Sequence, residues 1–170
     1  NVDDPVSLTS IMLELTRLAS DIPVVFPIHP RTRKMCAQFG ISTEGVTGLK
    51  ILQPIGYHDS LCLTENARFV LTDSGGLQEE STFFRTPCLT LRPNTERPVT
   101  ITAGSNRLTT VEDLRSDIAR VVAGPDRLGD IPPLWDGRTA ERIVAALVHT
   151  NGEMSGNEAS RKRSAPALAC

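Results

Sequence analysis

One short segment combines residue types suited to binding an anion and a sugar: VLTDSGGLQEES, at residues 70–81. If Ser74 caps a helix, the unpaired backbone N–H groups at Gly75 and Gly76 and the helix dipole favour an anion such as phosphate. Glycine has no side chain, so phosphate can approach the backbone closely. Glu80 follows Gly76 by four residues on the same helix face, and a carboxylate can accept two hydrogen bonds from a ribose diol. The segment therefore predicts a site for a nucleoside diphosphate.

The same segment has a simpler interpretation, a tight turn in which Ser74 is an ordinary cap and the glutamates are surface residues. Neither GxGxxG nor GxxxxGK[ST] occurs in the sequence, so the common dinucleotide-binding and P-loop folds lose support. Ser-Gly-Gly alone leaves both interpretations open.

Apolar runs and helical spacings alternate along the chain. Strands are predicted at residues 24–28, 49–52, 69–71, 88–91 and 108–109. Helices are predicted at residues 5–18, 32–39, 58–66, 74–84 and 111–122, with a last one at 140–147. This alternation predicts an α/β fold of three layers, with a parallel sheet covered on both faces and right-handed crossovers.

Three notable segments follow predicted strands: His29-Pro30, the Ser74–Gly76 turn, and residues Arg92 to Arg97. In open parallel sheets ligands bind beyond the carboxyl ends of the strands. The three segments are therefore expected to converge on one site.

Length and composition narrow the protein class. A chain of 170 residues suits one α/β domain, predicted for residues 1–150, and residues 151–170 lack an apolar period and are expected to be a disordered tail. The chain begins at Asn1 rather than at a methionine, so we expect a piece of a longer protein. A net charge of −2 gives no basic field for nucleic acid.

The cysteines and the hydropathy indicate a cytoplasmic protein. The four cysteines form no CxxC pair, which argues against structural zinc and fits a reducing compartment. No apolar run reaches membrane-spanning length and no signal peptide is visible, so neither membrane insertion nor secretion is expected.

Three segments also carry a family resemblance. TDSGGLQEES, LRPNTERP and PIHPRTRK resemble the C-terminal half of non-hydrolysing UDP-N-acetylglucosamine 2-epimerases, and the similarity extends over roughly residues 1–148. It implies a two-domain, glycosyltransferase-B-like fold with the nucleotide between two Rossmann-like halves, of which this chain is the UDP-binding one. The implied partners are UDP-N-acetylglucosamine or UDP, the missing N-terminal domain and a second copy in a homodimer. No metal or other cofactor is implied.

The resemblance assigns roles residue by residue. The Ser74–Gly76 backbone holds the UDP phosphates, Glu80 binds the ribose, His29 faces the cleft near the sugar nucleotide, and Arg97 lies near the same cleft. Structural alternatives stay open for some of these residues. His29 can simply cap a strand end, Arg97 can pair with Glu96 or another acid, and Glu79 is predicted to be a solvated neighbour.

Two residues depart from the family pattern. Ser60, in the helix GYHDSLCL below the uracil, stands where the family usually has an aromatic residue that packs on the base. Val99 stands where a glutamate usually follows TERP. The first departure bears on base affinity or selectivity, and the second on whatever contact that acid makes.

The reaction implied by the resemblance is inversion at C2 of the sugar. UDP is eliminated, a glycal-type intermediate forms, and UDP adds back. The family's catalytic carboxylates lie in the N-terminal domain, so this chain is expected to bind the leaving group and to be inactive alone. Two other classes remain: the nucleotide-binding half of a retaining glycosyltransferase, and a non-catalytic module that binds a UDP-sugar.

Overall fold

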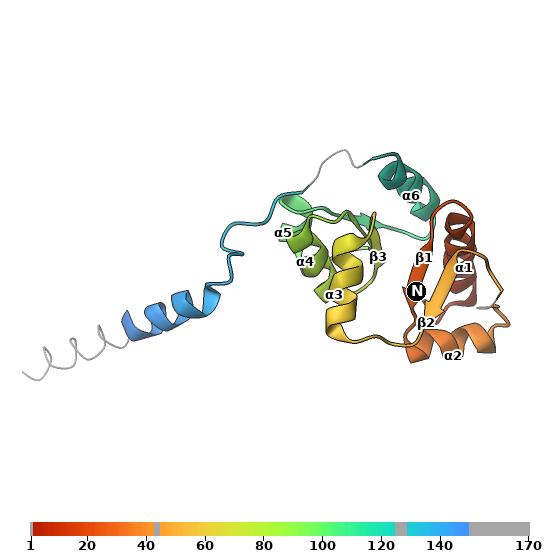
Figure 1. The fold of residues 1–170 in the computed structure, drawn as a ribbon, viewed down its shortest axis with the longest axis horizontal. Coiled ribbons are helices and arrows are strands. Elements are labelled where there is room, and N and C mark those ends of the chain that lie inside the picture. The colour runs from red at the N-terminus through yellow and green to blue at the C-terminus, as the bar shows by residue number, and fades with distance from the viewer. Residues whose placement is uncertain (1, 43–44, 125–128, 150–170) are drawn as a thin grey trace, which may run out of the picture. The chain divides into compact units, whose positions relative to one another are not determined.

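The computed structural model describes residues 2–42, 45–124 and 129–149 (Figure 1). The chain divides into two compact units, Asn1–Ile131 and Pro132–Cys170. The boundary between the units falls inside the domain predicted for residues 1–150. The predicted tail, 151–170, lies outside the described residues.

Helices and parallel strands alternate through the first unit, which confirms the predicted α/β fold. The elements are α1 (Pro5–Ala19), β1 (Val24–Pro27), α2 (Pro30–Gln38), β2 (Leu49–Leu52), α3 (Tyr57–Asn66), β3 (Val70–Thr72), α4 (Gly75–Phe84), β4 (Cys88–Leu91), α5 (Pro98–Thr102), β5 (Asn106–Thr109) and α6 (Leu114–Ala123). Helix α5 was not predicted, because five residues are too few to show a helical period.

Hydrogen bonds join the strands in two groups, β1-β2 and β3-β4-β5, with every pair parallel. The sequence predicted one sheet, but in the described part of the chain no ladder connects β1 to β3. Strand β3 has three residues and β1 ends at Pro27, which has no N–H to donate, so few such bonds are available. Ile11 and Leu71 pack against both hydrophobic clusters, so the two groups share one core.

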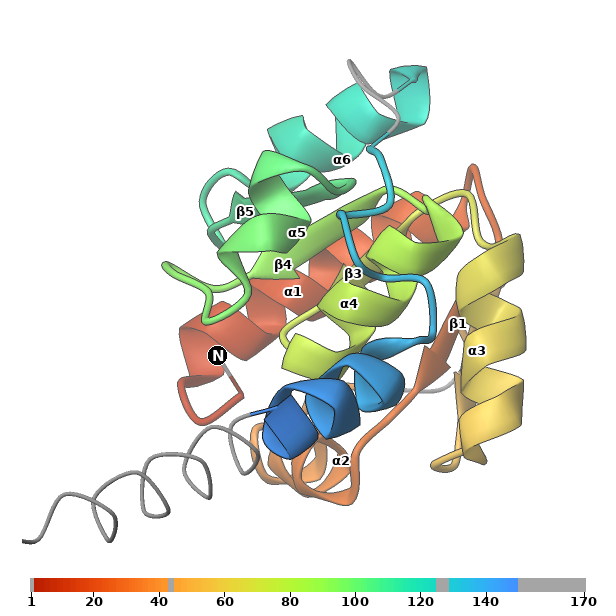
Figure 2. The ribbon, with the colours of Figure 1, turned by 90° about the vertical axis from the view of Figure 1, so that its left-hand side faces the viewer.

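Strand β4 is buried along its whole length and separates two layers of helices (Figure 2). Leu89 and Leu91 belong to the same apolar cluster as Ile118 of α6. On the opposite face the Cys88 thiol lies beside Ser81 of α4, and burial raises its pKa. Because successive strand residues point to opposite faces, α4 and α6 cover opposite sides of the sheet.

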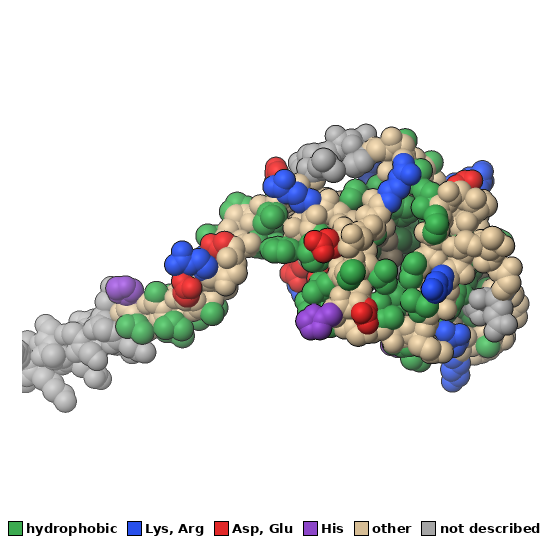
Figure 3. Space-filling model, viewed as in Figure 1, with side chains coloured by type: hydrophobic (Ala, Val, Ile, Leu, Met, Phe, Trp, Pro, Cys, Tyr) green, Lys and Arg blue, Asp and Glu red, His purple; other side chains and the backbone are tan. Residues whose placement is uncertain are grey.

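The second unit contains a helix at residues 139–149, close to the last predicted helix. Asp136 holds its start, since its carboxylate accepts hydrogen bonds from Arg142 Nη1 at 2.9 Å and from the Arg138 N–H at 3.0 Å. These bonds, that of Arg142 first, lower the pKa of Asp136 to about 2. Hydrophobic side chains are exposed along this helix (Figure 3), namely Ile143, Val144, Leu147 and Val148. Among the described helices, none has both the length and the apolarity to cross a bilayer.

Candidate functional site

The start of α4 lies directly beyond the carboxyl end of β3. Ser74 is the N-cap in an extended conformation, and among the described residues its side chain makes no cap hydrogen bond. Its backbone N–H instead donates to Thr72 Oγ1 at 3.0 Å. Gly75 and Gly76 occupy the first turn, where backbone N–H groups have no acceptor within the helix. This arrangement suits an anion.

Two carboxylates lie close to this turn. A Cβ atom placed on Gly76 would be 4.0 Å from Glu80 Oε1, so the Glu80 side chain leans back toward the helix start. A Cβ atom on Gly75 would be 2.9 Å from Oε1 of Glu96, which comes from the loop after β4. Burial raises the pKa of Glu80, and the neighbouring charge of Glu79 adds to this effect.

The loop that contains Glu96 is docked on α4. Arg97 Nε lies 3.0 Å from Glu79 Oε1, so Arg97 pairs with an acid of α4 and not with Glu96. Glu96 pairs instead with Arg92 at 3.0 Å. A hydrogen bond from its own backbone, followed by the contacts with Arg92 and Arg97, lowers the pKa of Glu96. The Glu79 side chain is 42% exposed, so Glu79 is a partly solvated neighbour of the turn that also pairs with Arg97.

His29 lies at the carboxyl end of β1 and caps α2. Its Nδ1 accepts a hydrogen bond from the Arg31 N–H at 3.2 Å. An accepting Nδ1 leaves the proton of a neutral imidazole on Nε2, so His29 has one N–H to donate. The side chain is exposed, and capping uses only Nδ1, so the Nε2–H can donate to a ligand.

Ser60 is a half-buried residue of α3, the helix that packs beside α4. The structure brings Glu80 and the Arg97 loop to the Ser74–Gly76 turn. Neither His29 nor Ser60 makes a hydrogen bond or ion pair with α4 in the described ranges. Val99, which differs from the glutamate usual in the family, lies in α5, one position after the helix starts at Pro98.

A buried polar cluster lies on the side of α4 that faces the sheet, and it was not predicted from the sequence. Gln78 Oε1 accepts hydrogen bonds from Thr95 Oγ1 at 2.5 Å and from Asn106 Nδ2 at 3.3 Å. Gln78, Ser81 and Thr82 are fully buried on one face of α4. Their spacing of three and four residues could have signalled a polar face turned toward the core.

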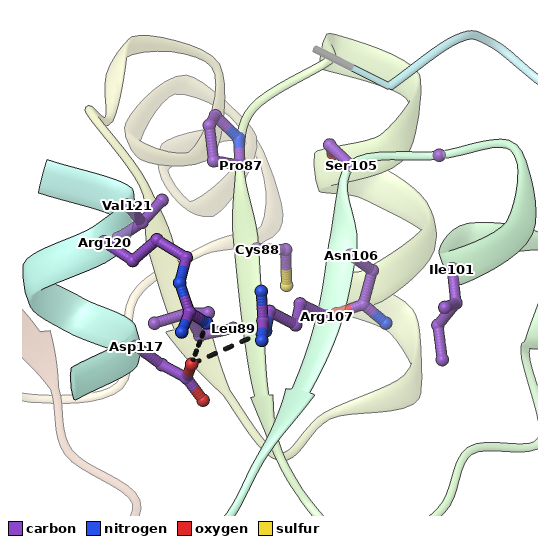
Figure 4. A pocket seen from close by; sticks show the side chains of 11 residues that line it. Pro87, Cys88, Leu89, Ile101, Ser105, Asn106, Arg107, Asp117, Arg120 and Val121 are labelled. Atoms are coloured by element: carbon purple, nitrogen blue, oxygen red, sulfur yellow. Dashed lines mark hydrogen bonds and ion pairs between the residues drawn. The ribbon is translucent and has the colours of Figure 1, made fainter. Parts of the chain in front are cut away.

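A separate cavity of about 220 Å³ opens at the amino ends of β4 and β5, the edge of the sheet opposite to Ser74 (Figure 4). At its wall the buried Asp117 carboxylate lies 2.7 Å from Arg120 Nη1 and 3.5 Å from Arg107 Nε. Asp117 thereby joins α6 to β5. We assign this triad a structural role.

Replacing Asp117 with alanine is expected to lower the free energy of unfolding by about 1–2 kcal/mol. Hydrogen bonds to charged groups contribute roughly 1.5–3 kcal/mol, and the half-exposed arginines regain part of this by hydration. Urea denaturation measures the change. The matched control is Asp3→Ala, which removes an exposed ion pair to Arg31 and should leave stability unchanged. Equal effects of the two substitutions would contradict the structural role of Asp117.

Comparison with known proteins identifies the family to which the chain is similar. Residues 1–148 match the family described as UDP-N-acetylglucosamine 2-epimerase. The chain is 36% identical over 155 residues to the UDP-N-acetylglucosamine 2-epimerase of Methanocaldococcus jannaschii, covering 88% of this chain and 42% of the relative. It is 37% identical over 149 residues to a UDP-2,3-diacetamido-2,3-dideoxy-D-glucuronate 2-epimerase of Pseudomonas aeruginosa, covering 86% and 41%.

Solved structures give the same picture. The M. jannaschii enzyme in complex with UDP-GlcNAc and UDP superposes with a TM-score of 0.71 at 35% identity, covering 88% of this chain and 42% of that one. The Neisseria meningitidis enzyme bound to UDP-GlcNAc gives 0.71 at 27% identity, covering 84% and 41%. The chain therefore spans about two fifths of the length of these proteins.

Proposed function

Because the chain belongs to the UDP-N-acetylglucosamine 2-epimerase family, we propose that it forms the half of such an enzyme that binds the UDP part of the nucleotide sugar. One observation carries the proposal: the Ser74–Gly76 turn starts a helix beyond a strand end, with Glu80 and the Arg97 loop beside it. Family membership also favours an epimerase over a glycosyltransferase.

The phosphates would bind at the first turn of α4. Its free N–H groups and the helix dipole favour negative charge, and Gly75 and Gly76 let phosphate oxygens approach. Arg97 is close enough to contribute a cation. Its pair with Glu79 is about 40% exposed on both sides, and such pairs contribute only about 0–1 kcal/mol, so Arg97 can turn from Glu79 to a diphosphate at little cost.

The ribose would bind at Glu80, whose carboxylate accepts hydrogen bonds from the two hydroxyl groups. Ser60 offers little surface to the base, so affinity for uracil is expected to be modest. The sugar that is processed remains a separate matter, because the relatives include enzymes for two different UDP-sugars.

The proposal is tested by titrating the 170-residue chain with UDP. NMR shift titration is suitable because one wall of a cleft is expected to bind at millimolar strength. We expect saturable shifts centred on the amides of Ser74, Gly75 and Gly76. A folded chain whose α4 amides do not respond to UDP would contradict the proposal.

We predict that the chain alone does not epimerise UDP-N-acetylglucosamine. The reaction needs a base for the C2 proton. The resemblance implies that the family's catalytic carboxylates lie in the other half of the enzyme, and Glu80 on the described α4 wall is assigned to ribose. Departure of UDP would be assisted here by the helix start. An NMR time course with the substrate checks this. Appearance of the C2 epimer at an enzymatic rate would show that the base lies within these 170 residues.

A further inference from the structure

We infer that the buried amide of Gln78 is a positioning residue, which holds the loop Thr95–Arg97 against the phosphate site. The inference rests on the proposed function and deepens it. Gln78 would place the charge of Arg97 at the site without touching the ligand itself.

Three successive loop residues meet three residues of α4. Thr95 Oγ1 donates to Gln78 Oε1 at 2.5 Å, and Arg97 Nε lies 3.0 Å from Glu79 Oε1. Between them, Glu96 lies over Gly75, within 2.9 Å of where a Cβ atom would be. Gln78 is fully buried, whereas the Arg97 and Glu79 side chains are about 40% exposed and Glu96 is exposed. The contact with Gln78 is therefore the best shielded attachment of the loop to α4.

The loop is also held from within. The Arg97 N–H donates to Thr95 Oγ1 at 2.9 Å, so the hydroxyl bound to Gln78 also fixes the backbone at Arg97. The Arg97 carbonyl accepts a hydrogen bond from Thr100 Oγ1 at 2.7 Å. The backbone N–H and carbonyl of Arg97 are therefore both hydrogen-bonded. The Arg97 side chain extends from a backbone position that is held close to α4.

Two buried residues of the sheet orient the Gln78 amide. Asn106 Nδ2 donates to Gln78 Oε1 at 3.3 Å and to Thr100 Oγ1 at 3.0 Å, while its Oδ1 accepts from Thr90 Oγ1 at 2.6 Å. With two donors on Oε1, the oxygen of the Gln78 amide is turned toward the loop. The network thus runs from the interior of the sheet to the site.

The amide is costly for the fold. Within the described residues, the buried Gln78 Nε2 has no hydrogen-bond partner, and such a donor destabilises a folded protein. An apolar side chain of similar size would remove this unpaired donor, but it would leave the Thr95 hydroxyl without its acceptor. In return, the amide oxygen of Gln78 holds the loop. Substitution of Gln78 should therefore weaken ligand binding more than it lowers the stability of the fold.

The sharpest test is at Thr95, which is half-buried in the loop and not in the core. Thr95→Val keeps the shape of the side chain and removes the hydroxyl, whereas Thr95→Ser keeps the hydroxyl. UDP affinity is measured by NMR titration of the 170-residue chain at two salt concentrations. We expect Thr95→Val to bind UDP about tenfold more weakly and with less salt dependence, because Arg97 no longer faces the diphosphate. Thr95→Ser should bind within about twofold of the original chain.

Two further variants separate positioning from stability. Gln78→Leu should lose about tenfold in UDP affinity while its unfolding midpoint stays within a few degrees. The matched control is Thr82→Val, one turn along α4 and equally buried, which removes a hydroxyl that donates to the Gln78 carbonyl at 2.8 Å. It should keep its UDP affinity, since its hydroxyl bonds to the backbone of α4 and not to the loop.

Thr95→Val binding UDP as well as the original chain would overturn the inference while leaving the proposed function intact. An equal loss in Thr82→Val would also overturn it, because any core substitution would then have the same effect. If the original chain shows no UDP response at α4, the proposed function fails and the inference fails with it.

Discussion

UDP is expected to bind at least about 100-fold more weakly when Gly75 is replaced by valine. The branched side chain would stand where a phosphate oxygen must approach the first-turn N–H groups. Each hydrogen bond to a charged group contributes roughly 1.5–3 kcal/mol, so losing two corresponds to 100-fold or more. Since the original chain is expected to bind at millimolar strength, the loss is measured by NMR titration as the absence of saturable UDP shifts at α4.

The fold should survive this substitution, because the atom nearest to a Cβ on Gly75 is the end of the Glu96 side chain, which can move. Gly76→Ala is the matched control for strain. Its Cβ would lie 3.8 Å from Ser74 Oγ and 4.0 Å from Glu80 Oε1, which is ordinary contact. Alanine is the better helix former, so this variant should melt no lower than the original chain and still bind UDP less well. Unchanged UDP affinity in both folded variants would exclude the α4 start as the phosphate site.

Replacing Glu80 with glutamine is expected to weaken UDP by roughly 10- to 150-fold, the equivalent of one charge-assisted hydrogen bond. Binding of 2′,3′-dideoxy-UDP should hardly change, because that ligand has no hydroxyl groups to donate to the carboxylate. Parallel titrations of the two ligands measure the difference. Equal weakening of both would indicate a disturbed fold or a merely structural acid.

Acidification tests Glu80 in a second way. Burial, with Glu79 adding to it, raises the pKa of Glu80 above its ordinary value. UDP affinity that requires the ionised carboxylate is lost as the pH falls through this raised pKa, earlier than for an ordinary glutamate. Stability of the free chain moves oppositely: the raised pKa favours the folded state at low pH, and this contribution is lost as the pH rises through it. Phosphate protonates near pH 6, so the Glu80→Gln profile is subtracted.

The order of the elements could be predicted from the sequence because each has a strong local pattern. Pro5 and the apolar period after it mark α1, and the apolar run at residues 88–91 marks β4. The short helix α5 has no such pattern, and the separation of the strands into two hydrogen-bonded groups depends on tertiary packing. Neither could be predicted from local residue types.

At the candidate site, the turn was visible in the sequence and its surroundings were not. The residue types of Ser74 and the two glycines are enough to predict a helix start. That Arg97 selects Glu79 rather than its neighbour Glu96 depends on how a loop folds back, which spacing does not specify. The buried role of Gln78 was hidden because glutamine is usually exposed, and only the packing of α4 on the sheet places it inside.

Strand β4 separates an apolar part of the core, on the side of α6, from a hydrogen-bonded polar part, on the side of α4. Behind it, Leu89 and Leu91 lie among aliphatic side chains, where many combinations of similar volume fill the space equally well. In front of it, Thr90 belongs to a chain of directional bonds that admits few alternatives. Random substitution should therefore be tolerated unequally along this one strand. The sequence can vary more on the side that faces α6 than on the side that faces α4 and carries the candidate site.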